Sequence, residues 1–208
     1  MINLLRLWLP LITLLLGGCT STYQLPKESL TVTAPGLSQQ EFLSAFSAWQ
    51  LTGKMSFKGH PEDFSGTLIW QQQHNKLDIR LNTYLGISVF SIKSLSSNKV
   101  VLEADGKSFT SNNPEQLLTD MAGISLPLNN FKFWVKGQVD EESVISLEKD
   151  EQGLLKQVTF LDSNGQYWTL DYQRWQTWGH WQLPQRLTLK GKGVTVKILI
   201  KEWLELTR

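Results

Sequence analysis

The chain has one thiol, Cys19, which directly follows two glycines. Ahead of the glycines, residues 7–16 form an apolar run, and Arg6 is the only charged side chain before it. A basic start, a short apolar segment and small residues before a cleavage point are typical of a secretory signal peptide. The run is also shorter than the roughly 20 apolar residues that a membrane-spanning helix needs. We therefore expect residues 1–18 to be a signal peptide that is removed on export.

The chemistry that Cys19 could support is acylation. The segment Leu16-Gly17-Gly18-Cys19 resembles the bacterial lipobox, which implies that Cys19 receives a diacylglyceryl thioether and becomes the acylated mature N-terminus. Thr20, rather than Asp, follows the cysteine, and in enteric-type bacteria this implies sorting to the outer membrane. The alternative is an uncleaved anchor with an incidental cysteine. On the first interpretation, the protein is lipid-anchored in the bacterial outer membrane with its domain facing the periplasm.

No other group of residues predicts a reaction. His60, His74 and His180 are scattered without H-E-x-x-H spacing, and a lone cysteine provides neither an intramolecular disulfide nor a cysteine metal site. Residues 86–89 lack the final glycine of G-x-S-x-G, and Gly191-Lys192-Gly193 is a strand turn rather than a phosphate loop. We expect no catalytic residue, no metal and no cofactor, so the protein is not expected to be an enzyme.

The charge balance and the aromatic content indicate which kinds of partner the protein could bind. Removing residues 1–18 takes away one of the 20 basic side chains, so the mature chain has 19 basic and 19 acidic side chains. Because the basic residues form no run or stripe, a nucleic-acid partner is not expected. Eight of the nine Trp lie in the mature part, and so many large rings favour an aromatic-lined cavity, a membrane-edge face, or both.

The chain divides into a tether and one domain. Residues 19–37 hold the lipidated cysteine and a stretch with Pro, Ser and Thr but no periodicity, which predicts a flexible tether. Residues 38–208 are long enough for one domain with a sizeable core. Ser38 and Glu41 have the spacing of a capping box, so we expect a helix over residues 39–49 with its aromatic residues on one face.

From residue 51 the apolar period changes to two, which is typical of half-buried antiparallel strands. Two helices, over 114–121 and 128–135, interrupt the strands. This pattern predicts a mainly β (α+β) fold, in which one curved antiparallel sheet has helices packed on one side. The eleven expected strands are 51–58, 64–71, 76–81, 86–94, 98–104, 107–111, 143–149, 154–162, 166–174, 183–191 and 193–203.

Several stretches, in this order and spacing, together resemble the outer-membrane lipoprotein receptor LolB family. They are WQLTGKMSF (49–57), GTLIWQQ (66–72), NTYLG (82–86), LPLNNF (126–131) with Trp134 and Gly137, NGQYW (164–168), LTL (187–189), VKI (196–198) and Trp203. The resemblance covers nearly the whole mature chain. It implies an incomplete antiparallel β-barrel whose helices cover an apolar cavity.

The resemblance also implies a function and partners. LolB proteins accept acylated lipoprotein cargo from the periplasmic carrier LolA and insert it into the inner leaflet of the outer membrane. LolA shares the fold but has no acylated cysteine, so Cys19 favours the receptor over the carrier. We expect a monomer that works without a cofactor. A structural or assembly lipoprotein that holds no lipid is the alternative, and a lipid hydrolase is a more distant one.

The cavity and a membrane-insertion loop are the expected sites. The leucine that LolB proteins direct at the membrane corresponds to Leu85, with Tyr84 beside it, although the segment 82–86 lacks the proline that the family commonly has there. A lipid anchor exposes dozens of methylenes at about 0.8 kcal/mol each, so its carrier needs an apolar hollow. The alternative for the cavity residues is a solid core. The expected cavity residues are Leu68, Trp70, Ile79, Leu81, Phe131, Trp134, Trp168, Val196 and Ile198.

Trp175, Trp178 and Trp181 form a second unusual group, spaced three residues apart in what we expect to be a connection between strands. One interpretation is a hairpin whose rings pack back on the sheet. The other is a set of interfacial rings that rest at the level of the lipid headgroups.

Overall fold

The computed structural model describes residues 37–206 apart from 60–62, 97–98, 123–125, 140–143 and 163–164. The expected signal peptide, Cys19 and all but the last residue of the expected tether lie outside the described residues. Val32–Arg208 forms a compact unit by itself, with all the described helices and strands inside it. Within the described ranges, no helix is both long and apolar enough to cross a bilayer.

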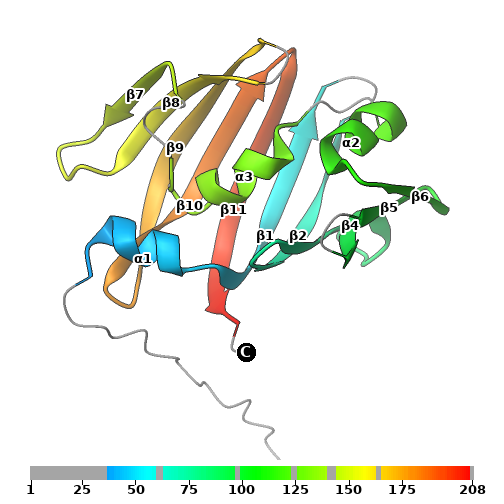
Figure 1. Ribbon diagram of the computed structural model, residues 1–208, viewed down its shortest axis with the longest axis horizontal. Coiled ribbons are helices and arrows are strands. Elements are labelled where there is room, and N and C mark those ends of the chain that lie inside the picture. The colour runs from blue at the N-terminus through cyan, green and yellow to red at the C-terminus, as the bar shows by residue number, and fades with distance from the viewer. Residues whose placement is uncertain are drawn as a thin grey trace, which may run out of the picture. The chain divides into compact units, whose positions relative to one another are not determined.

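One antiparallel sheet dominates the domain (Figure 1). Eleven strands are found in the described part of the chain, in the spatial order β6-β5-β4-β3-β2-β1-β11-β10-β9-β8-β7. The sheet is open, because β6 and β7 lie at its two edges and do not pair with each other. The strands are β1 (Ala48–Lys58), β2 (Phe64–Gln73), β3 (Lys76–Asn82), β4 (Ser88–Ser96), β5 (Lys99–Ala104), β6 (Lys107–Ser111), β7 (Ser146–Lys149), β8 (Leu155–Leu161), β9 (Tyr167–Trp178), β10 (Trp181–Gly191) and β11 (Val194–Glu205).

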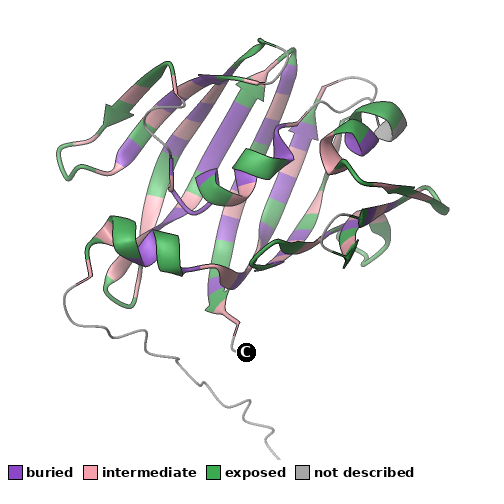
Figure 2. Ribbon diagram, viewed as in Figure 1, coloured by how far each residue is buried: buried purple, intermediate pink, exposed green. Residues whose placement is uncertain are grey.

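Three helices, α1 (Gln39–Ala45), α2 (Pro114–Ala122) and α3 (Leu128–Trp134), lie on one face of the sheet. We call this the inner face and the opposite one the outer face. Residues along the central strands alternate between buried and more exposed, as period-two patterning requires (Figure 2). The buried apolar residues form one cluster between the inner face and the helices. The expected fold class is therefore confirmed: a mainly β, incomplete barrel-like sheet with helical cover.

Helix α1 corrects one expectation. The capping box is present, since Ser38 Oγ accepts a hydrogen bond from the Glu41 backbone N–H while the Glu41 carboxylate accepts one from the Ser38 N–H. The helix nevertheless ends at Ala45, with Phe46 as its C-cap, instead of continuing to residue 49. Trp49 belongs to β1, where it pairs with Gln72 of β2. The apolar spacing fits a helix and a strand equally, and the hydrogen bonds of β1 with β2 and β11 favour the strand.

The tryptophan group lies in a hairpin rather than in a long connection. Strand β9 continues through Trp178 and β10 begins at Trp181, so only a two-residue turn separates them. The Trp181 ring stacks on Phe42 of α1, with 4.5 Å between ring centroids. Trp178 Nε1 donates to the Trp203 carbonyl at 3.0 Å, and Trp175 Nε1 donates to a carbonyl of β8. The rings therefore pack back on the domain, as the first of the two interpretations predicts.

Lys136 joins helix α1 to the segment after α3. Its side chain is 4% exposed, and its Nζ donates to the carbonyls of Leu43 (2.6 Å) and Phe46 (2.8 Å). These carbonyls lie at the C-terminal end of α1, where helix carbonyls lack intrahelical partners and a cation is favourable. Burial, with a smaller contribution from the nearby charge of Lys132, lowers the pKa of Lys136 to about 8.

Candidate functional site: an apolar cavity and an exposed loop

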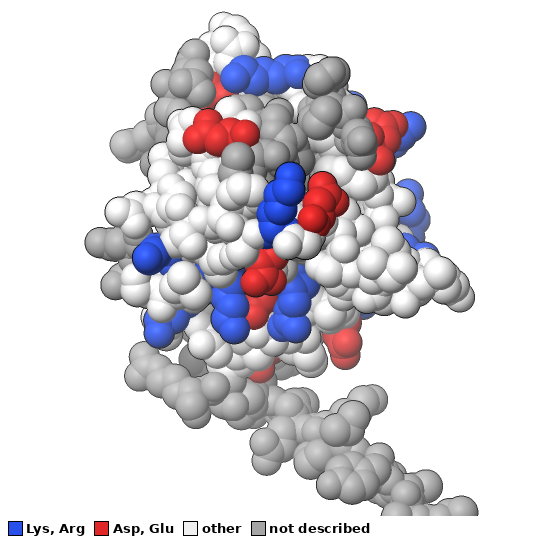
Figure 3. All heavy atoms as spheres, turned by 90° about the vertical axis from the view of Figure 1, so that its right-hand side faces the viewer, with Lys and Arg blue, Asp and Glu red and all other residues white. Residues whose placement is uncertain are grey.

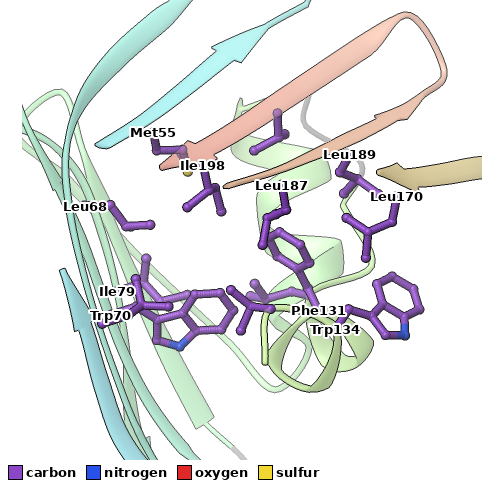
Figure 4. Packing of buried hydrophobic residues seen from close by; sticks show 14 of the residues in the cluster. Met55, Leu68, Trp70, Ile79, Phe131, Trp134, Leu170, Leu187, Leu189 and Ile198 are labelled. Carbon is purple, nitrogen blue, oxygen red and sulfur yellow. The ribbon is translucent and has the colours of Figure 1, made fainter. Parts of the chain in front are cut away.

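An apolar cavity lies between the inner face and helices α2 and α3. Figure 4 shows some of the side chains that line it, among them Leu68, Trp70 and Ile198. Strands β1 to β4 and β11 form its floor, and Leu118 of α2 and Phe131 of α3 belong to its cover. All the side chains that line it are apolar, so it has no fixed partner for a polar ligand. The lining residues are Met55, Phe57, Phe64, Leu68, Trp70, Ile79, Phe90, Ile92, Leu118, Leu126, Leu128, Phe131, Val196 and Ile198.

The cavity is small in this structure, about 40 Å³. On this measure about 10–15 Å³ is enough to hold one water molecule, so the cavity has room for only a few waters. An acyl chain contains many methylenes and needs a much larger space. The cavity is thus too small for such a chain, and a long apolar ligand would have to displace part of its cover.

The structure brings six of the nine expected cavity residues together around this space. They are Leu68, Trp70, Ile79, Phe131, Val196 and Ile198. The other three are buried in the same cluster but do not line it. Leu81 is fully buried on β3, and the Trp134 ring packs on Phe160 with 3.9 Å between centroids. The buried Trp168 ring lies against Gly191, and its Nε1 donates to Asp162 at 3.2 Å.

Sequence reasoning missed the other lining residues. Met55 and Phe57 alternate along β1 with outward-facing residues, and this alternation marks them as inner-face residues. Phe90 and Ile92 alternate in the same way with outward-facing residues along β4. What the alternation leaves open is which inner-face residues meet the cavity, because this depends on where the helices pack.

The two helices over the cavity are held differently. Helix α3 is fixed by Tyr172, whose hydroxyl donates to the Trp134 carbonyl at 2.7 Å and whose pKa is raised by burial. Helix α2 is capped by Asn113, whose Oδ1 accepts from the backbone N–H groups of Glu115 and Gln116. The Glu115 carboxylate also accepts from the Asn129 N–H at 2.8 Å, which joins α2 to the start of α3. Helix α2 lies over the β5–β6 side of the sheet (Figure 1).

A loop between β3 and β4 exposes three large apolar side chains. Tyr84 is 93% exposed, Leu85 81% and Ile87 64%. Leu85 and Tyr84 were expected there, whereas Ile87 was missed, although an apolar residue so close to the turn was the available signal. The cavity lies toward the same end of the strands, since its lining residue Phe64 begins β2 and Phe90 is close to the start of β4.

Hydrogen bonds order this loop without a proline. The Thr83 N–H donates to the Ile87 carbonyl (2.7 Å), and the Ile87 N–H donates to Thr83 Oγ1 (3.1 Å). The Gly86 N–H donates to the Thr83 carbonyl, and Gly86 has a φ of +83°, where a glycine is favoured. Thr83 thus closes a short turn that presents Tyr84 and Leu85 to solvent.

Among the described residues, no group of three or more His, Cys, Asp or Glu side chains could hold a metal ion. Cys19, the only residue expected to carry a covalent modification, lies outside them.

Comparison with known proteins adds to this geometry. The family model described as "Outer membrane lipoprotein LolB" matches residues 47–203. The chain is 34% identical over 191 residues to the outer-membrane lipoprotein LolB of Pseudoalteromonas translucida, covering 91% of this chain and 89% of that one. It is 32% identical to the protein of the same name from Shewanella denitrificans, covering 91% and 88% of the two chains.

Two solved structures share the fold. A putative outer membrane lipoprotein-sorting protein domain from Vibrio parahaemolyticus superposes with a TM-score of 0.51 at 9% identity, covering 81% of this chain and 91% of that one. A DUF1329 family protein from Desulfovibrio piger gives 0.52 at 7% identity, covering 80% and 89%. These likenesses concern the fold alone, whereas the family model and the curated relatives extend over most of the sequence. The chain therefore belongs to the LolB family of outer membrane lipoproteins.

Proposed function

We propose that this protein is a non-catalytic lipoprotein receptor. It accepts acylated lipoproteins from a LolA-type periplasmic carrier, holds their acyl chains in the apolar cavity and inserts them into the inner leaflet of the outer membrane. The observation that carries the proposal is the cavity itself, because its lining is apolar throughout and helices cover it. Membership of the LolB family supports the same role.

The free energy of the task favours such a cavity. Each methylene removed from water contributes about 0.8 kcal/mol, so an acyl chain in transit needs continuous apolar shielding. A solidly packed core would leave no room to shield an acyl chain, whereas a cavity whose cover can move would provide that room. The sequence has no phosphate-binding motif. Cargo must then pass from the carrier to the receptor and on to the bilayer in the direction of increasing affinity.

In this proposal, movement of helix α2 enlarges the cavity so that an acyl chain can enter. Leu117 and Leu118 of α2 are buried, and Leu118 lines the cavity; Asn113 caps the helix, and a hydrogen bond from Asn129 to Glu115 joins it to α3. Helix α3 is held to the sheet by Tyr172 and by contact of Phe131 with Trp70. Movement of α2 would join the small cavity to solvent while α3 keeps its place.

The test is a pair of charge substitutions on one strand. Leu68→Glu puts an unpaired carboxylate in the cavity wall, and binding of a fluorescent acylated peptide should fall at least about tenfold. Ile69→Glu, at the next position but on the outer face, is the matched control and should bind normally. Circular dichroism and thermal melting establish that both variants fold. Leu118→Phe fills the cavity without a charge and should also weaken binding.

Transfer from a loaded LolA to each variant then tests the handover. Loss of transfer in Leu68→Glu and Leu118→Phe, with retention in Ile69→Glu, is expected. A folded domain that binds no acylated peptide would contradict the proposal and favour a structural or assembly lipoprotein without a lipid-transfer role.

A further inference from the structure

A basic hollow of about 540 Å³ lies on the outer face, away from the helices. Its only charged lining residues are Lys54, Arg186 and Lys197, and no carboxylate lines it. Hydroxyl groups, among them those of Ser65 and Thr67, add further hydrogen-bond donors. The hollow thus offers a concave site for a group that is anionic and rich in oxygen atoms.

The sheet register gathers these charges from three strands. Lys54 of β1 and Arg186 of β10 both pair with Leu199 of β11, and Lys197 is two residues before it on β11. Side chains two residues apart on a strand share a face, so Lys197 points to the same side as Leu199. Five adjacent strands, β9-β10-β11-β1-β2, therefore form the floor of the hollow.

The three cations are exposed, and no ion pair involves them within the described part of the chain. Two basic residues elsewhere on the sheet do have close acidic partners: Lys190 pairs with Asp171 at 3.1 Å, and Arg80 with Asp78 at 3.0 Å. On the side with α2, β5 and β6, basic and acidic residues are interspersed (Figure 3). The hollow thus gathers three positive charges, with no carboxylate in its lining, in a chain whose total charge is nearly balanced.

Tyr84 connects the hollow to the exposed loop. It lines the hollow beside Thr67, and it belongs to the turn that exposes Leu85 and Ile87. An exposed apolar loop next to unpaired cations is the combination that binds a protein to a membrane surface, where apolar side chains enter the lipid and cations meet phosphates. Tyrosine is also enriched at the level of the headgroups.

We propose that the hollow binds the phosphate of an anionic phospholipid and so orients the domain on the membrane. Arg186 can bind two phosphate oxygens at once, and the lysines act as compact charges beside it. Free phosphate shares this chemistry, but the adjoining apolar loop favours phosphate at a lipid surface. The inference rests on the proposed function, in which the protein inserts its cargo into the outer membrane, and deepens it.

The experiment uses a chain that begins at Thr20, because Val32–Arg208 is a compact unit by itself and the lipid anchor would mask weaker binding. Its partition onto vesicles of phosphatidylcholine, with and without phosphatidylglycerol, is measured by co-sedimentation. Each charge near an anionic surface contributes about fivefold to the partition coefficient, so the triple variant Lys54→Gln, Arg186→Gln and Lys197→Gln should lose on the order of a hundredfold on anionic vesicles. Binding to neutral vesicles should not change.

A matched control removes the same charge elsewhere. Lys76→Gln, Lys99→Gln and Lys201→Gln together change three exposed lysines toward the opposite end of the strands, and this variant should retain anionic-vesicle binding. Equal losses in the two triple variants would overturn the proposal, because net charge alone would explain them. Displacement by micromolar inorganic phosphate at constant ionic strength would overturn it too, since the site would then be one for a free anion.

Acyl-peptide binding in solution separates this inference from the proposed function. The hollow variant should bind the peptide normally. If the unmodified domain binds no peptide, the proposed function fails while the lipid site can still be tested on vesicles. If the hollow variant keeps anionic-vesicle binding but no longer accepts cargo from a loaded carrier, the hollow is a protein-docking surface and the lipid proposal is wrong.

Discussion

Gly137 shows how one residue fixes the cover of the inner face. It follows α3, has a φ of +83°, and a Cβ at this position would lie 2.8 Å from Cζ3 of Trp175. The Trp175 ring has little freedom to move away, because it stacks on Tyr172 and its Nε1 donates to the Leu155 carbonyl at 3.1 Å. Both the backbone conformation and the close approach therefore require glycine.

Gly137→Ala should lower the free energy of unfolding by about 2–4 kcal/mol, measured by urea denaturation. The left-handed conformation contributes about 1–2 kcal/mol and the clash with the ring about as much again. Gly86→Ala is the matched control, since Gly86 has the same φ of +83° and no atom within 4 Å of an added Cβ. Gly86→Ala should lower the free energy of unfolding only by the contribution of the left-handed conformation. An equal loss of unfolding free energy in the two variants would mean that the Trp175 ring moves aside without cost, which would contradict the prediction.

At the scale of the element, Asn113 is the residue that most directly controls α2. Its side chain accepts the N–H groups of Glu115 and Gln116, and substitution of such a cap by alanine costs a helix about 1 kcal/mol. If α2 opens the cavity, Asn113→Ala should speed acyl-peptide association about fivefold. Stopped-flow fluorescence measures this rate. Ser38→Ala removes the equivalent cap of α1, which does not line the cavity, and should leave the rate unchanged. A similar acceleration in both variants would exclude α2 as the specific gate.

The positions of the strands were predicted from the sequence better than any other part of the structure. Alternation such as that of Val194, Val196, Ile198 and Ile200 depends only on the strand period, so it identified the strands before any contact was known. The end of α1 was wrong because Trp49 suits a helix face and a strand face equally, and only the pairing of β1 with β2 decides between them.

The cavity was less accessible to sequence reasoning than the strands. Trp134 and Trp168 belong to the buried cluster, as their positions predicted, but each packs away from the cavity against partners on other elements. Ring size alone does not show whether a tryptophan holds a space open or fills it. The basic hollow was missed for a similar reason, since Lys54, Arg186 and Lys197 are far apart in sequence and only the register assembles them.

At the scale of the whole domain, the cavity and the exposed loop lie toward the same end of the sheet. Tyr84 lies between the loop and the hollow on the outer face. A domain that approached the bilayer with this end would put Leu85 into the lipid and the cavity close to it. Burying one leucine contributes about 1.5–3 kcal/mol, which is enough to orient a domain but not to anchor it. Retention would come from the acyl chains proposed at Cys19.

Leu85→Glu should therefore separate receipt of cargo from delivery. On the proposed function, receipt from a loaded LolA uses the cavity and should be nearly intact. Release into liposomes should fall at least about tenfold, because a charge would replace the side chain that is proposed to enter the lipid. Leu95→Glu is the matched control: Leu95 is also exposed, but it lies near the far end of β4, away from the loop, and its variant should release normally. Receipt and release are measured separately, the second with cargo loaded beforehand. A Leu85→Glu domain that fails to receive cargo yet releases preloaded cargo normally would assign the loop to the carrier-docking surface instead of the membrane.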